Sequence, residues 1–82
     1  MQDIRNQVIH CFGLVFPDIA PDEIPRCSTS SVATWDSVAQ VTLLSALSEE
    51  FNIDFDPQDY EELLSFAEIV AFVEHRLTGA NG

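Results

Sequence analysis

The chain has 82 residues, of which 46% are hydrophobic, and this length and composition fit one small folded domain. Fourteen Asp and Glu residues against three Arg and no Lys give a net charge of −11 at pH 7. Such a surface repels phosphate backbones and anionic lipid headgroups, so it argues against nucleic acid and membrane as partners and favours basic patches on other proteins.

The first predicted element is a helix over residues 3–16. Apolar side chains recur along one face of it at the 3.6-residue helical spacing: Ile4, Val8, Cys11, Phe12 and Val15. Asp3 lies in the first turn, where the helix dipole favours an anion, and Pro17 ends the helix.

A long connection over residues 17–35 follows and contains three of the four prolines. Its apolar residues are Ile19, Ile24, Val32 and Trp35. Because these side chains can pack over the core, we expect an ordered loop rather than a flexible linker.

The second helix is predicted from Ser37 to about Phe51, with Asp36 as its N-cap. Its buried stripe is expected at Val41, Leu44, Leu47 and Phe51, flanked by Leu43. The opposite, exposed face then carries Val38, Thr42, Ser45 and Glu49, of which Val38 is the one apolar member.

Two further helices complete the predicted fold. Ile53 and Phe55 alternate inward, and then Asp56 is expected to cap a short helix with Pro57 at its first position. Ser65 and Glu68 form a capping box before a last helix, whose stripe is Phe66, Ile69, Val73 and Leu77 and which Gly79 ends. The sequence therefore predicts a single all-α domain over residues 1–82, a four-helix bundle of three main helices and one short one, with an ordered core over about residues 3–78.

The residue inventory does not favour a metal site. Asp54, Asp56 and Asp59 suggest calcium, but an EF-hand loop counted from Asp54 needs Gly at its sixth position and Glu at its twelfth, where this chain has Asp59 and Ser65. We interpret this acidic cluster as capping and solvated charge.

Self-contained catalysis is not expected either. A nucleophilic serine needs a nearby base, and the two histidines, His10 and His75, lie among polar residues of their helices, where we expect them to face solvent. Cys11 and Cys27 form no CxxC motif; Cys11 is expected to be a buried thiol, and the state of Cys27 is open. With no stretch that resembles a secretory leader or a bilayer span, a cytoplasmic protein is the simplest expectation.

Ser37 raises the question of function, because Asp36 already caps the helix. The hydroxyl is either ordinary first-turn filler or an attachment point. A phosphate linked there would meet unsatisfied backbone N–H groups and the positive end of the helix dipole. Asp36 would partly oppose that charge, which suggests that it engages a metal or a basic residue of a modifying enzyme.

The run Trp35-Asp36-Ser37-Val38, followed by "LSEEFNI" over residues 47–53 and "LSFAEIV" over residues 64–70, resembles the acyl carrier proteins. The resemblance covers about residues 3–78. It implies that Ser37 is esterified with 4′-phosphopantetheine, which a phosphopantetheinyl transferase supplies from coenzyme A. The arm would carry acyl or aminoacyl groups as thioesters, and the protein itself would catalyse nothing.

The resemblance also implies partners, namely acyl-loading and acyl-processing synthase enzymes with basic docking patches, which would bind a monomeric carrier. The docking residues that it implies lie on the second helix and just before it: Trp35, Asp36, Val38, Thr42, Ser45 and Glu49. Val38 replaces the usual Leu or Met, and Thr42, Ser45 and Ser48 stand where carboxylates are common. Both departures favour a specialised polyketide, nonribosomal peptide or related pathway over general fatty-acid synthesis.

One alternative remains open from the sequence, an unmodified acidic helical adaptor that binds a basic protein partner. The sequence does not identify the cargo or the synthase. An initial Met and an end soon after the last helix suggest a free-standing chain, with an excised domain as the alternative.

Overall fold

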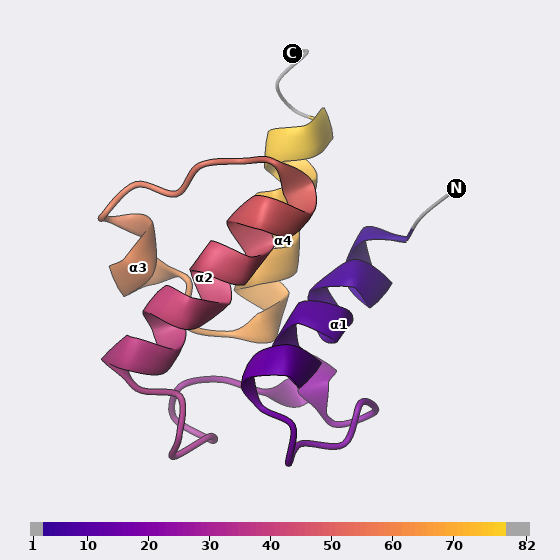
Figure 1. The fold of residues 1–82 in the computed structure, drawn as a ribbon, viewed down its shortest axis with the longest axis vertical. Coiled ribbons are helices and arrows are strands. Elements are labelled where there is room, and N and C mark those ends of the chain that lie inside the picture. Colours follow the sequence, from indigo (N-terminus) through magenta and orange to yellow (C-terminus); the bar gives the residue numbers. More distant parts are fainter. Residues whose placement is uncertain (1–2, 79–82) are drawn as a thin grey trace.

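The computed structural model describes residues 3–78 and contains four α-helices and one short 3₁₀ helix, as Figure 1 shows. The elements in chain order are α1 (Ile4–Val15), the 3₁₀ helix η1 (Ile24–Arg26), α2 (Ser37–Phe51), α3 (Asp59–Glu62) and α4 (Phe66–Thr78). No strand occurs in the described residues, so the predicted all-α bundle of three main helices and one short helix is confirmed. The predicted helix stop at Gly79 lies outside the described residues.

The core lies between α1, α2 and α4, and α1 packs against both of the other two helices. Its centre is an aromatic cluster in which the Phe12 ring centroid lies 5.3 Å from Trp35, 5.4 Å from Phe66 and 6.0 Å from Phe16. The Trp35 and Phe66 contacts are edge-to-face, the arrangement that aromatic quadrupoles favour. These rings join α1, the long loop and α4 into one packed unit.

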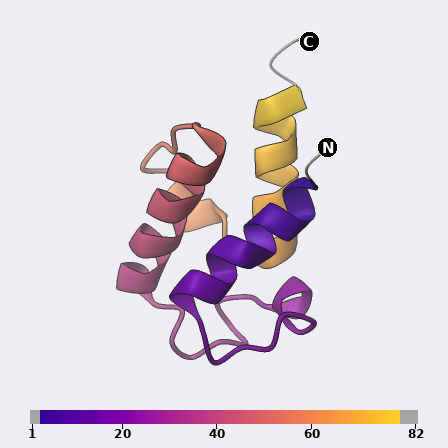
Figure 2. The same cartoon turned by 45° about the vertical axis from the view of Figure 1, so that its right-hand side comes forward.

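The long loop is ordered, as expected, and turns beneath the end of α1 to reach the start of α2 (Figure 2). Ile24 and Trp35 are buried in the core, whereas Ile19 and Val32 pack against it half-buried. Two backbone hydrogen bonds fasten the loop to the start of α4: the Thr29 N–H donates to the Leu64 carbonyl at 2.9 Å, and the Phe66 N–H donates to the Cys27 carbonyl at 3.0 Å. These bonds fix the direction from which the chain enters α2.

The buried stripes of two helices differ from the prediction. Val41 is 52% exposed, and the inner face of α2 consists of Gln40, Leu43, Leu44, Leu47 and Phe51. This set follows the i, i+3, i+4, i+7, i+11 pattern with a polar residue in its first place, so the true stripe starts one residue earlier than apolar residues alone suggest. In α4, Leu77 is 39% exposed and Val70 is buried instead, since Leu77 lies beyond the part of the helix that covers the core.

The helix ends also refine the prediction. Asp3 is the N-cap of α1 rather than a first-turn residue, and its carboxylate accepts from the Arg5 N–H at 3.0 Å. Asp56 does not cap a helix at Pro57: its own N–H donates to the Asp59 carboxylate at 2.8 Å, and α3 begins only at Asp59. In an Asp–x–x–Asp run, either carboxylate can accept a backbone N–H and so stabilise the turn. Here the second carboxylate, that of Asp59, is the acceptor.

The capping box at the start of α4 is confirmed with one change. The Glu68 N–H donates to Ser65 Oγ at 3.2 Å, as the motif requires. The Glu68 carboxylate accepts from the Leu64 N–H at 3.2 Å, one residue before the expected donor. The capping serine thus occupies its predicted place at the junction that also holds the long loop.

Candidate functional site

Ser37 is the first residue of α2 and its side chain is exposed. The predicted cap is confirmed, since Asp36 Oδ1 accepts the Ala39 N–H at 2.9 Å. Within residues 3–78 the Ser37 hydroxyl makes no hydrogen bond, so it is not needed for the helix end. The structure therefore presents a free hydroxyl to solvent at the positive end of a helix of 15 residues.

Two hollows meet at Ser37. The larger, of about 550 Å³, lies between α2 and α3 and is lined by Ser37, Gln40, Val41, Pro57, Tyr60 and Glu61. The smaller, of about 230 Å³, is lined by Thr29, Trp35, Asp36, Ser37, Gln40, Tyr60 and Leu64. A group attached to the hydroxyl consequently has recessed surface on both sides of its anchor.

A buried glutamine forms the common wall of both hollows. Gln40 is 5% exposed, and its Oε1 accepts the Trp35 Nε1–H at 2.6 Å. Its Nε2 donates to the Leu63 carbonyl at 2.8 Å and to the Tyr60 carbonyl at 3.2 Å. Sequence reasoning missed this residue, because polar side chains are assigned to the surface by default.

The exposed face of α2 contains the residues that the sequence places there. Val38 is 74% exposed, and Thr42, Ser45 and Glu49 are exposed along the same face. Val41 adds a second exposed apolar side chain beside the larger hollow. The apolar area at the start of α2 is therefore wider than Val38 alone.

Trp35 does not belong to this surface. Its side chain is 4% exposed and packs edge-on against Phe12, so the expectation that it contacts docking partners is wrong. Its role is internal: the indole fills the core, and its N–H reaches Gln40.

Beyond Asp36, acidic residues of α3 flank the larger hollow at Ser37. This one-turn helix carries Asp59, Glu61 and Glu62, and Glu61 lines the larger hollow. The opposite wall at the start of α2 is uncharged apart from Asp36. The Ser37 hydroxyl thus lies between exposed apolar side chains of α2 and acidic side chains of α3.

Catalytic and metal-binding groups do not gather here. His10 and His75 are exposed on α1 and α4, as predicted, and neither lines a hollow at Ser37. Residues 3–78 contain no group of three or more His, Cys, Asp or Glu side chains that could hold a metal ion. In the same residues no helix is long and apolar enough to cross a membrane.

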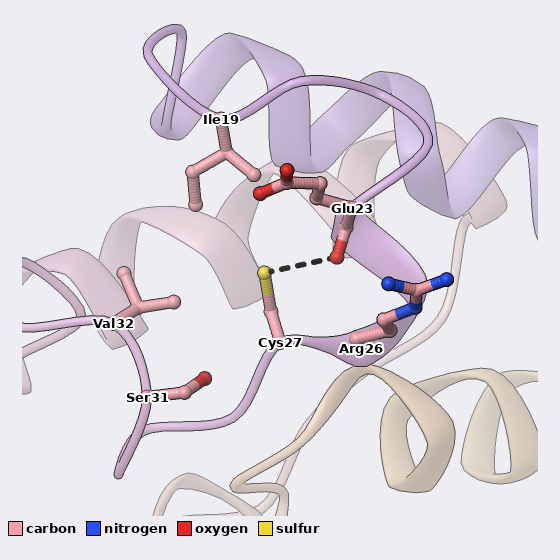
Figure 3. Close-up of a pocket in the computed structure, with 6 residues that line it drawn as sticks. All are labelled: Ile19, Glu23, Arg26, Cys27, Ser31 and Val32. Carbon is pink, nitrogen blue, oxygen red and sulfur yellow. Dashed lines mark hydrogen bonds between the residues drawn. The ribbon is translucent and has the colours of Figure 1, made fainter.

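A separate hollow of about 440 Å³ lies within the long loop and surrounds Cys27 (Figure 3). The Cys27 thiol donates to the Glu23 carbonyl at 3.5 Å, and apolar Ile19 and Val32 face it from the loop. Burial, followed by the negative charge of Glu23, raises the pKa of this thiol. Cys27 is thus a free, buried and protonated thiol, which answers the question that the sequence left open.

A protein-family model described as "Phosphopantetheine attachment site" matches residues 35–73. The match begins at Trp35, includes Ser37 and the whole of α2 and α3, and ends within α4. Over these residues the chain is similar to the phosphopantetheine-attachment family. Proteins of this family bear a covalent 4′-phosphopantetheine group, and their carrier domains are generally non-catalytic. Comparisons with curated proteins and with solved structures give no match.

The residues at the start of α2 fit that prosthetic group. Asp36 accepts only one of the N–H groups of the first turn, at Ala39, so other first-turn N–H groups stay available to phosphate oxygens. The exposed Ser37 hydroxyl is of the chemical type that such an ester linkage needs. When bound, the arm supplies a terminal thiol on which an acyl group can be carried.

Proposed function

We propose that Ser37 is the attachment residue and that the chain is a carrier protein. It tethers acyl or aminoacyl groups as thioesters on 4′-phosphopantetheine and hands them to partner enzymes, while catalysing no step itself. The observation that supports this most directly is the exposed, unbonded Ser37 hydroxyl, which lies within the matched segment 35–73. A hydroxyl in that state is accessible to a transferase and contributes no hydrogen bond that modification would break.

The helix end favours the modified form electrostatically. A phosphodiester at Ser37 carries one negative charge, which the dipole of α2 stabilises within the first turn. Asp36 directs one carboxylate oxygen to the Ala39 N–H, which leaves its other oxygen free for a cation. We propose that the phosphopantetheinyl transferase engages Asp36 through a metal ion or a basic side chain.

Partner enzymes are proposed to bind across the start of α2 and α3. Val38 and Val41 offer apolar contact, Thr42, Ser45 and Glu49 continue the exposed face, and α3 adds carboxylates that attract a basic patch. The small and largely uncharged face of α2 favours a dedicated synthase of a polyketide, nonribosomal peptide or related pathway. The carrier is proposed to act as a monomer in the cytoplasm.

Intact-mass measurement after incubation with coenzyme A and a promiscuous phosphopantetheinyl transferase tests the assignment. The wild-type chain and Ser45→Ala, a matched exposed serine on the same helix, should each gain the mass of one phosphopantetheine. Ser37→Ala should gain none and should keep its stability within about 0.5 kcal/mol, since the lost hydroxyl has no partner. An unchanged mass of folded wild-type protein would refute the proposal and favour the unmodified adaptor. Modification of S37A would refute Ser37 as the attachment residue.

A further inference from the structure

Among residues 3–78, Gln40 is the one polar side chain that is buried. It lies one turn after Ser37, on the side of α2 that faces the core. Its amide is fully used: the two Nε2 hydrogens go to the carbonyls of Tyr60 and Leu63, and the oxygen accepts from Trp35. Only this orientation of the amide satisfies one donor and two acceptors, so the environment fixes it.

These bonds hold α3 in place. The helix is a single turn, none of its residues is buried, and it has no side-chain cap. Gln40 ties α2 to a carbonyl of that turn at Tyr60 and to the carbonyl of its C-cap, Leu63. The distance between α2 and α3, and with it the width of the larger hollow, therefore depends on these two hydrogen bonds together with the burial of Leu63.

Gln40 also separates the hollow from the core. It lines the larger hollow directly, whereas Leu43, Leu44 and Leu47 on the same face of α2 are fully buried and do not line it. A chain that passed from Ser37 into the core would have to displace the glutamine. That would leave the Trp35 N–H and two carbonyls without partners in an apolar surrounding, a costly outcome.

We infer that Gln40 is a positioning residue that closes the core beneath Ser37 and confines the carried group to the surface hollow between α2 and α3. The cargo class that fits is a short acyl or aminoacyl unit, which can lie against Val41, Pro57 and Tyr60 without entering the bundle. A long acyl chain gains no burial between the helices of this carrier. The inference rests on the proposed function, because it takes Ser37 as the point of attachment.

The hold on α3 is tested on the unmodified chain by amide hydrogen exchange. Gln40→Ala should speed exchange of the hydrogen-bonded Leu63 amide and its neighbours by about tenfold or more, relative to core amides of α4. The matched control is Gln58→Ala, which removes an exposed side chain that donates a hydrogen bond to the Glu62 carboxylate. Unchanged exchange in Q40A would overturn the inference.

The cargo class is tested by loading butanoyl- and octanoyl-phosphopantetheine from the corresponding coenzyme A esters, followed by thioester cleavage with hydroxylamine. In the wild type and Q58A the two cleavage rates should agree within about twofold, since neither chain is sheltered in the core. In Q40A the octanoyl ester should be cleaved several times more slowly than the butanoyl ester, because the core is open to it. A purely structural role for Gln40 would not make cleavage depend on chain length.

Slow cleavage of the octanoyl ester in the wild type would overturn the inference even though loading succeeded. If the chain takes up no acyl-phosphopantetheine at all, the proposed function is refuted instead. The hydrogen-exchange experiment would still test whether Gln40 holds α3 in place. If Q40A does not fold, Gln40→Leu, which keeps the bulk but not the hydrogen bonds, replaces it in the exchange measurement. The comparison of the two esters on the wild type then decides the cargo class.

Discussion

Replacing Asp36, the residue before Ser37, with alanine tests its role as the cap of α2. The variant loses the 2.9 Å bond from the Ala39 N–H to the carboxylate. Loss of an N-cap typically costs about 1 kcal/mol. Loss of a favourable charge at the helix end adds roughly 0.3–1 kcal/mol, part of which is offset because one of fourteen carboxylates is removed from a chain of charge −11.

A net loss of about 1 kcal/mol corresponds to a fall in melting temperature of roughly 4–8 °C for a domain of this size. Thermal unfolding followed by circular dichroism measures it, with Glu49→Ala as the control that removes an exposed carboxylate of α2 but no cap. Asp36→Asn keeps an acceptor at the cap but loses the charge, so its melting temperature should lie between those of D36A and the wild type. If the melting temperature of D36A equals that of the wild type, or if that of E49A falls as far as that of D36A, the cap does not stabilise α2 as described.

The same Asp36 variants test the transferase contact. D36N retains the helix end but not the charge, so we expect it to fold normally and to take up phosphopantetheine more slowly than the wild type. Equal uptake rates at matched protein concentration would show that the Asp36 charge serves the fold alone.

Three further outcomes are expected. Moderate salt should raise the melting temperature, because screening weakens repulsion among the carboxylates, and a flat or falling melting temperature would contradict this. In urea unfolding, Leu43→Ala should cost about 2–5 kcal/mol and Val41→Ala less than about 1 kcal/mol, whereas equal losses would contradict the observed face of α2. Burial raises the pKa of Cys11 from 9.0 to about 11. The protonated thiol therefore makes its full contribution to the free energy of unfolding below pH 9, and this contribution is lost as the pH rises toward 11. Over that window, stability should fall by roughly 2 kcal/mol more in the wild type than in Cys11→Ala.

Most helix bounds could be predicted from sequence because they depend on local chemistry. Asp36 and Ser65 cap their helices through side-chain oxygens that bond within three residues, and such bonds need no tertiary information. The period of apolar residues likewise located α1, whose buried residues Val8, Cys11 and Phe12 all belong to the predicted stripe.

The register of α2 could not be predicted in this way. Gln40 is buried only because the carbonyls of Tyr60 and Leu63, 20 and 23 residues along the chain, receive its two hydrogens. Periodicity assigns glutamine to the surface, and it therefore predicts that the neighbouring Val41 points into the core. The hollow beside Ser37 could not be predicted either, because its walls come from two helices that the sequence does not place side by side.

The long loop was foreseen as ordered but not in its detail. Its short 3₁₀ turn has Pro25 near its start, a compatible local signal, yet the turn is fixed by the buried Ile24. The link from Thr29 and Cys27 to the start of α4 depends on backbone groups, which carry no sequence signature. Contacts of this kind become visible only in the folded chain.

The chain contains a single tryptophan, and this indole lies two residues before Ser37, buried against Phe12 and bonded through its ring nitrogen to Gln40. Tryptophan fluorescence therefore comes from one known environment, and it reports on the start of α2 without an added fluorescent label. An emission shift on loading or on binding a synthase would show that the change reaches the bundle interior. A constant spectrum would show that the prosthetic arm moves while its base stays still.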